Sequence, residues 1–176
     1  MKVTEPPHPE RWAPRVRKPQ HPQIQIQEGT NLKIATINTR GLATEERMVE
    51  LEMALEERNE DIIGLSEIRK IGEQIITREN GNLFYYLGEN KGRNGVGFMV
   101  KKNVRKYVTE IKGVNDRIAI LKLEISDKEK LKIIQIYAPT SVASEHDHRN
   151  FYNKLQEIID EPYTNLQEKN HNYGRF

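Results

Sequence analysis

Residues 61–69 of this 176-residue chain read Asp-Ile-Ile-Gly-Leu-Ser-Glu-Ile-Arg. An apolar run that gives way at once to polar residues is typical of a buried β-strand with polar residues at its end. The segment before it repeats this plan, because Leu32, Ile34 and Ile37 predict a strand that ends at residues 38–41, Asn-Thr-Arg-Gly. The sequence therefore predicts two strands whose ends both carry polar side chains.

A helix is predicted between these two strands. Thr44 is a suitable N-cap, and the two glutamates that follow it lie in the first turn, where the helix dipole favours negative charge. Apolar residues then recur on one face until about Asn59. The order strand, helix, strand predicts an α/β domain.

The rest of the chain to residue 161 is predicted to be rich in strands and to end in a helix. Strands are predicted at residues 83–87, 95–100, 119–125 and 131–138, the first two as a hairpin. The helix is predicted from residue 145 to about residue 161, because four apolar residues recur at helical spacing. They are Phe151, Leu155, Ile158 and Ile159.

The N-terminal 29 residues differ in composition from the rest. Six of the eight prolines lie within the first 22 residues, and residues 1–27 carry five basic side chains against two acidic ones. Proline removes a backbone donor and prevents helix propagation, so we expect residues 1–29 to form a disordered, proline-rich basic arm. The remaining residues together carry almost no net charge, so net charge gives no argument for nucleic-acid binding.

Composition also excludes several classes of protein. The chain has no cysteine, which excludes disulfides and thiolate zinc sites. It has no apolar run long enough to span a membrane, and no apolar N-terminal run that would act as a secretory signal. We expect an intracellular protein, nuclear or cytoplasmic, with no membrane partner, whose chemistry uses oxygen and nitrogen groups or a hard metal.

Polar residues at three predicted strand ends suit phosphate chemistry. A carboxylate such as Glu67 binds Mg²⁺ directly, and an amide such as Asn38 orients a metal ligand or a phosphate oxygen. Tyr137, Arg40 and Thr140 add donors for phosphate oxygens. Polar residues also end the strands of many α/β domains for solubility alone, so that interpretation stays open.

Five segments, taken in order, resemble the endonuclease/exonuclease/phosphatase superfamily, to which DNase I and the apurinic endonucleases belong. They read ATINTRGL at residues 35–42, DIIGLSEIR at 61–69, GVGFMV at 95–100, DRI at 116–118 and IQIYAPTS at 134–141. The nearest likeness is to the endonuclease domain of RTE-type retrotransposons and to craniofacial development protein 2-like proteins. The resemblance spans residues 31–161.

The resemblance implies a four-layer α/β sandwich with mixed sheets, a divalent metal (Mg²⁺ or Mn²⁺) and DNA as the ancestral substrate. By position, Glu67 is similar to the family's metal-binding glutamate and Asn38 to the asparagine that arranges metal and phosphate. Tyr137 and Arg117 are similar to the catalytic tyrosine and arginine. Thr140 stands where apurinic endonucleases usually have asparagine, so a plain turn residue is the alternative there.

Two motifs of the family's second half, Gly-Asp-x-Asn and Ser-Asp-His, do not occur in the chain. Residues 162–176 show little hydrophobic pattern, and we expect a divergent, poorly ordered tail. The sequence therefore predicts a sandwich that is incomplete on its C-terminal side. The predicted function is that of a truncated Mg²⁺-dependent DNA endonuclease with little or no turnover. The alternative is a non-catalytic remnant or interaction module that keeps part of the fold.

Overall fold

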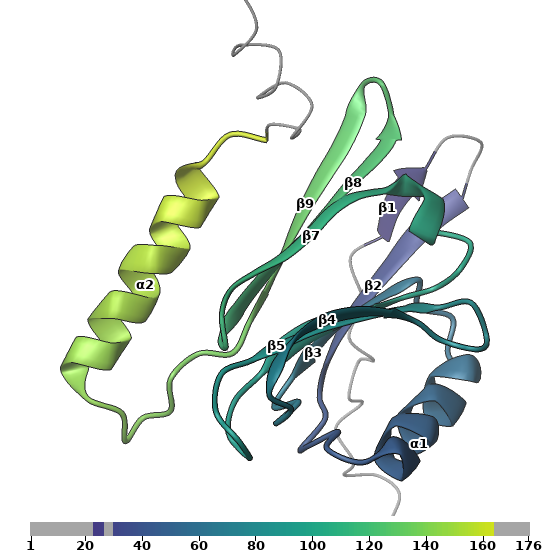
Figure 1. The fold of residues 1–176 in the computed structure, drawn as a ribbon. Coiled ribbons are helices and arrows are strands. Elements are labelled where there is room, and N and C mark those ends of the chain that lie inside the picture. The colour runs from purple at the N-terminus through teal and green to yellow at the C-terminus, as the bar shows by residue number, and fades with distance from the viewer. Residues whose placement is uncertain (1–22, 27–29, 164–176) are drawn as a thin grey trace, which may run out of the picture.

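Two β-sheets and two α-helices make up the described part of the chain, residues 23–26 and 30–163, in this computed structural model (Figure 1). The larger sheet has the spatial order β1 (Gln23–Ile26), β2 (Thr30–Asn38), β3 (Ile62–Ser66), β6 (Val96–Val100), β5 (Leu83–Gly88) and β4 (Gly72–Thr77). The smaller sheet has the order β7 (Val108–Asn115), β8 (Ile118–Ser126) and β9 (Glu129–Ile136). The helices are α1 (Glu45–Glu56) and α2 (Glu145–Asp160), and a short 3₁₀ turn, η2 (Arg105–Tyr107), precedes β7.

Strand direction separates the two sheets. In the larger sheet β2 and β3 are parallel and the other pairs are antiparallel, so the predicted mixed character is confirmed there. The smaller sheet is antiparallel throughout its three described strands. The parallel pair is joined through α1, as a crossover between parallel strands requires.

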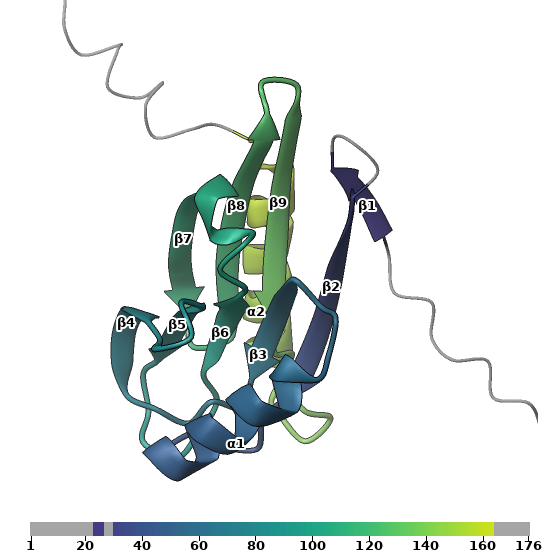
Figure 2. The same ribbon diagram turned by 90° about the vertical axis from the view of Figure 1, so that its right-hand side faces the viewer.

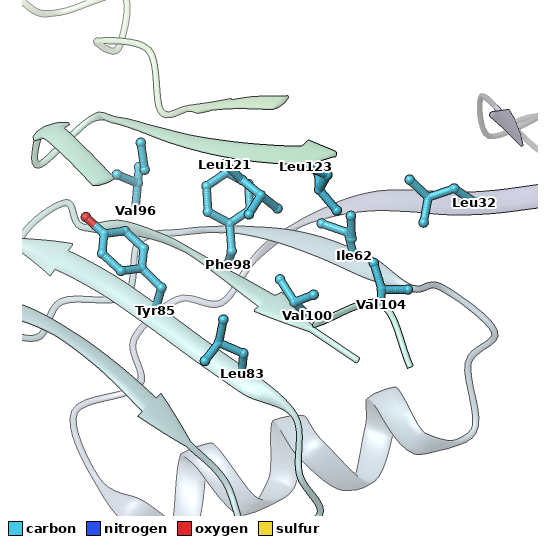
Figure 3. Packing of buried hydrophobic residues seen from close by; sticks show 11 residues of the cluster. Leu32, Ile62, Leu83, Tyr85, Val96, Phe98, Val100, Val104, Leu121 and Leu123 are labelled. Carbon is cyan, nitrogen blue, oxygen red and sulfur yellow. The ribbon is translucent and has the colours of Figure 1, made fainter. Parts of the chain in front are cut away.

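The elements form four layers, in the order α1, larger sheet, smaller sheet, α2 (Figures 1 and 2). One apolar cluster fills the space between the sheets and includes Ile62, Tyr85, Phe98, Leu121 and Leu123 (Figure 3). A second cluster joins α1 to the other face of the larger sheet, and a third joins α2 to the outer face of β8. Each sheet is therefore covered on both faces, which is the predicted four-layer sandwich.

Alternation along single strands explains how these layers are built. In β8, Ala119 and Leu121 face the larger sheet, while Ile118 and Ile120 face α2. Successive strand residues point to opposite faces, so a strand buried on both sides is apolar at nearly every position. Strand β3 shows this completely, because all five of its residues are buried.

Both predicted helices are present, and Thr44 is the N-cap of α1 as predicted. The Thr44 side chain accepts a hydrogen bond from the backbone N–H of Arg47, and Ser144 does the same for Asp147 at the start of α2. Neither helix is long and apolar enough to cross a membrane, among the residues that the structure describes.

Three strands were not predicted: β1, β4 and β7. Strand β1 falls inside the arm assigned to residues 1–29, and it pairs antiparallel with the first residues of β2. The other residues of the arm, 1–22 and 27–29, and residues 164–176 of the predicted tail lie outside the described part of the chain.

Candidate functional site

The ends of three separate strands bring Asn38, Glu67 and Tyr137 together. Asn38 is the last residue of β2, Glu67 follows β3 directly, and Tyr137 follows β9 directly. One oxygen of Glu67, Oε1, accepts hydrogen bonds from Asn38 Nδ2 at 2.8 Å and from the Tyr137 hydroxyl at 2.9 Å. Parallel pairing places Asn38 opposite Ser66, so the Glu67 side chain starts one residue beyond that pair. We call these three residues the Glu67 cluster.

Unusual backbone conformations surround the Glu67 cluster. Among the described residues, four other than glycine have a positive φ, and all four lie at this end of the larger sheet: Arg40 (53°), Glu67 (54°), Arg69 (59°) and Asn94 (46°). Such a conformation costs of order 1–3 kcal/mol per residue when the surroundings do not hold it, and it concentrates at functional sites.

Hydrogen bonds hold this strained backbone in place. The hydroxyl of Thr39 donates to the carbonyls of Ser66 and Glu67, at 3.0 and 3.1 Å. The N–H of Arg69 donates to the Asn94 carbonyl at 2.9 Å. The turn after β3 is thus tied to its neighbours on both sides, which fixes the direction of the Glu67 side chain.

The charge state of the Glu67 cluster follows from its hydrogen bonds. The donors Asn38 and Tyr137 hold the pKa of Glu67 below its ordinary value, and Arg69, 3.0 Å from Oε2, adds to the effect against the opposing influence of burial. Burial, followed by the hydrogen bond to Glu67, raises the pKa of Tyr137. At neutral pH the cluster therefore contains a carboxylate and a neutral phenol that donates to it.

Arg117 lies beside Tyr137. Its Nη1 donates to the Tyr137 carbonyl at 3.1 Å, and its guanidinium lies 5.3 Å from the centre of the Tyr137 ring. The N–H of Tyr137 donates in return to the Arg117 carbonyl at 2.8 Å. In this structure Arg117 positions Tyr137, and the arginine's own phosphate contact stays a prediction.

The two residues assigned to phosphate differ in their surroundings. Arg40 is exposed, and its backbone N–H donates to Asn38 Oδ1 at 3.0 Å, which orients the amide toward Glu67. Thr140 is also exposed, and its carbonyl accepts a hydrogen bond from the N–H of Ala143, as in a turn. The phosphate role of both residues stays a prediction.

A cavity of about 660 Å³ opens beside the Glu67 cluster. Its lining includes five basic side chains and no acidic one: Arg40, Arg47, Arg69, Lys70 and Lys91. Tyr86 and Ile71 add apolar surface, and Lys70 Nζ lies 5.5 Å from the centre of the Tyr86 ring. We call this space the cationic cavity.

Three basic residues of the cationic cavity were missed from the sequence. Arg47, Lys70 and Lys91 come from α1, from the turn before β4 and from the loop between β5 and β6. Lys101 and Lys102, by contrast, are adjacent in the sequence and lie at the opposite end of β6 from Val96, which pairs with Ser66. Position in the fold, rather than a run of basic residues, creates the cationic surface near Glu67.

The donor set allows only a limited metal site. Among residues 23–26 and 30–163, no group of three or more histidines and carboxylates is arranged to hold a metal ion. Proteins often bind Mg²⁺ through one or two carboxylates, with water and substrate phosphate completing the shell. Glu67 fits that pattern as a single carboxylate ligand, provided that the metal displaces Arg69 from Oε2.

The amino-acid sequence of the chain is similar to that of two known proteins. No family model matches the chain. Craniofacial development protein 2 of Bos taurus is 31% identical over 106 residues, and the same protein of Tragulus javanicus is 30% identical over 102 residues. These alignments cover 60% and 58% of this chain and 18% of each relative, so the chain spans less than a fifth of the proteins that it matches.

Comparison with solved structures identifies the fold. The AP endonuclease LMAP of Leishmania major superposes with a TM-score of 0.56 and 13% sequence identity, over 73% of this chain and 47% of that chain. The chain therefore has part of the DNase I-like fold. The likeness to craniofacial development protein 2-like proteins that the five sequence segments indicate is confirmed.

Proposed function

We propose that the Glu67 cluster binds a divalent cation together with a phosphodiester of DNA, as one half of a Mg²⁺-dependent endonuclease site. The observation that carries this proposal is the convergence of Asn38, Glu67 and Tyr137 on one carboxylate oxygen from three strand ends. An ionised carboxylate that neutral donors hold in place is a suitable ligand for a hard metal.

Each residue has a distinct role in this proposal. Glu67 holds the metal, Asn38 fixes the direction of the Glu67 carboxylate, and the Tyr137 hydroxyl donates to a phosphate oxygen. When bound, Mg²⁺ or Mn²⁺ would supply positive charge to the phosphate as it is attacked. The five basic side chains of the cationic cavity are placed to contact the phosphates on one side of that position.

We infer little or no hydrolysis by this chain. The groups that contact the Glu67 carboxylate are an amide, a phenol and a guanidinium, and none of these is a good general base at neutral pH. The motifs Gly-Asp-x-Asn and Ser-Asp-His are absent from the sequence. Lack of a positioned base alone lowers the rate by about 10²-fold to 10⁴-fold.

Metal-dependent DNA binding is the test of this function. The affinity of the full chain for a fluorescently labelled DNA duplex is measured by anisotropy at fixed ionic strength, with and without Mg²⁺. Mg²⁺ is expected to strengthen binding by the wild type, and Glu67→Gln to remove that gain, about tenfold in affinity. Glu157→Gln removes an exposed carboxylate on α2 and is the matched control, with no change expected.

A plasmid-nicking assay on the same proteins tests turnover. Nicking in Mg²⁺ by the wild type, abolished by Glu67→Gln, would show a competent nuclease and contradict the inferred low rate. A DNA affinity that changes neither with Mg²⁺ nor with Glu67→Gln would contradict the metal site. That result would favour the alternative of a non-catalytic module that keeps part of the fold.

A further inference from the structure

A second groove runs between α1 and the end of β4, away from the Glu67 cluster. It has a volume of about 460 Å³. Val49 and Met53 of α1 form its apolar part, with 44% and 64% of their surfaces exposed. Four glutamates also line it: Glu45, Glu52, Glu56 and Glu79. We call this the α1 groove.

The apolar part of the α1 groove belongs to a side of α1 that is exposed. Met48 and Leu55 point into the core below the helix and are buried. Val49 and Met53, four residues apart, lie together on another side of the same helix. Single exposed apolar residues are common on protein surfaces. An adjacent apolar pair inside a hollow with acidic walls is a more specific feature.

The charge of the α1 groove restricts what can occupy it. Arg78 is the only basic residue in its lining and already contacts Glu45 and Glu52, the latter at 2.9 Å. Four acidic groups against one basic group leave the groove negative, with Glu56 and Glu79 at its ends. A complementary occupant is both apolar and basic.

Residues 11–18 of this chain have that composition. They read Arg-Trp-Ala-Pro-Arg-Val-Arg-Lys, with four basic side chains, no acidic one and the only tryptophan of the protein. This segment lies outside the described residues. Trp12 and Val16 provide the apolar groups, and the basic residues alternate with them.

The described chain begins in β1, near the C-terminal end of α1. The first described residue, Gln23, pairs with Lys33 in β2. Lys33 in turn exchanges two hydrogen bonds with Asp61, at 3.0 and 2.8 Å, and Asp61 lies a few residues beyond the C-terminal end of α1. Strand β1 lies at the opposite edge of the larger sheet from β4, so residues 11–18 would have to cross the α1 side of that sheet to reach the groove.

Chain length permits the contact. The eleven residues from Trp12 to Gln23 span up to about 36 Å when extended. The five strand spacings from β1 to β4 measure about 24 Å across the sheet. Because the segment is tethered, its effective concentration at the groove is in the millimolar range, so weak contacts are sufficient.

We propose that residues 11–18 dock into the α1 groove, with Trp12 against Val49 and Met53 and the basic side chains against the four glutamates. The single tryptophan makes the full chain its own reporter. In the wild type, Trp12 emission is blue-shifted relative to tryptophan in water and is protected from quenching by acrylamide. Salt weakens this protection, because exposed charge pairs are screened.

Met53→Lys is the direct test. It removes an apolar contact and adds a repelling charge, and it lowers the ratio of docked to free arm by about tenfold. Trp12 emission then shifts to the red and acrylamide quenching increases. Ile159→Lys makes a similar change at an exposed residue of α2 and leaves the emission unchanged. Far-UV circular dichroism checks that both variants keep the fold.

A charge exchange tests the pairing without touching the apolar contact. Arg15→Glu with Arg17→Glu exposes Trp12, and adding Glu56→Lys with Glu79→Lys restores its protection. A variant that had simply unfolded would not be rescued in this way.

Three results would overturn the proposal. The first is wild-type Trp12 emission equal to that of tryptophan in water. The second is protection that Met53→Lys leaves unchanged. The third is protection that grows with protein concentration, which would identify a second copy of the chain as the occupant.

Discussion

Glu67 and Glu110 are both mostly shielded carboxylates in contact with basic side chains, yet the two are held differently. Their side chains are 18% and 11% exposed. Glu67 is bound first by the neutral donors Asn38 and Tyr137, and Arg69 adds a weaker effect. Glu110 lies within β7, where Lys122 Nζ is 2.6 Å away and Lys112 Nζ is 3.4 Å away.

The cause of each pKa shift shows what the two carboxylates are suited to do. Burial acts most strongly on Glu110 and favours its protonated form, but the two lysines outweigh burial and hold its pKa below the ordinary value. Lys122 is itself only 6% exposed, so this pair is enclosed. Glu67 instead stands at a strand end and shares Arg69 with the cationic cavity. The enclosed pair is expected to stabilise the fold, and the strand-end carboxylate to bind a ligand.

Lys122→Met is expected to have the largest effect on stability. The substitution removes the nearer and more enclosed of the two lysines from Glu110 and leaves only Lys112 at 3.4 Å, which lowers the free energy of unfolding by about 3 kcal/mol. Urea denaturation measures this change. Mg²⁺-dependent DNA binding of the folded variant stays at the wild-type level, because Lys122 lies far along β8 from the Glu67 cluster.

A double variant checks the reason for this loss. Replacing a whole buried ion pair with apolar residues is often neutral or stabilising, so Lys122→Met with Glu110→Leu is expected to recover most of the stability. If Lys122→Met alone lowered the free energy of unfolding by less than about 1 kcal/mol, the pair would contribute no more than an ordinary surface ion pair. The contrast with Glu67 would then be lost.

The surroundings of each strand explain which strands the sequence could predict. Strand β3 was predicted because burial on both faces leaves an apolar run that is visible in the sequence. Strand β8 was predicted from apolar residues at alternate positions. Strand β7, which carries Glu110, was missed because the pairing register shifts at Val108/Glu110 and at Gly113/Asn115. These irregularities break the period of two on which strand prediction depends. Strand β4 was missed because it is an edge strand, exposed at five of its six positions.

The candidate site also has one part that the sequence predicts and one part that it does not. Asn38, Glu67 and Tyr137 were predicted because each ends a recognisable strand, and the structure brings their side chains into contact. The cationic cavity was not predicted, because Arg47 and Lys91 become neighbours only through the positions of α1 and the loop between β5 and β6. No local sequence pattern predicts that these two side chains lie close together. Adjacent Tyr85 and Tyr86 point to opposite faces of β5, and both are buried because the sheet is covered on both faces.

Tyr137→Phe is expected to have a smaller effect on stability than Lys122→Met. It removes one hydrogen bond to a charged acceptor, which lowers the free energy of unfolding by about 1 to 2 kcal/mol at neutral pH. Because the folded-state pKa of Tyr137 is raised above its ordinary value of 10.0, the phenol's contribution is complete below that pH and is lost as the pH rises through the raised pKa. Urea denaturation at pH 7 and at high pH tests this. A difference between wild type and variant that stays constant with pH would mean that the hydroxyl does not donate to Glu67.

Glu67→Gln is expected to have the smallest effect on stability, although it has the largest effect on metal binding. Glutamine keeps an oxygen that accepts from Asn38 and Tyr137, so only the charged part of the interaction is lost, less than about 1 kcal/mol at pH 7. The folded-state pKa of Glu67 lies below its ordinary value of 4.5, so its contribution is complete above that pH and is lost as the pH falls through the lowered pKa. The difference between wild type and variant should therefore shrink in acid. If Glu67→Gln instead destabilised the chain as much as Lys122→Met, the strand-end carboxylate would be holding the fold as Glu110 does, and the division between the two regions would fail.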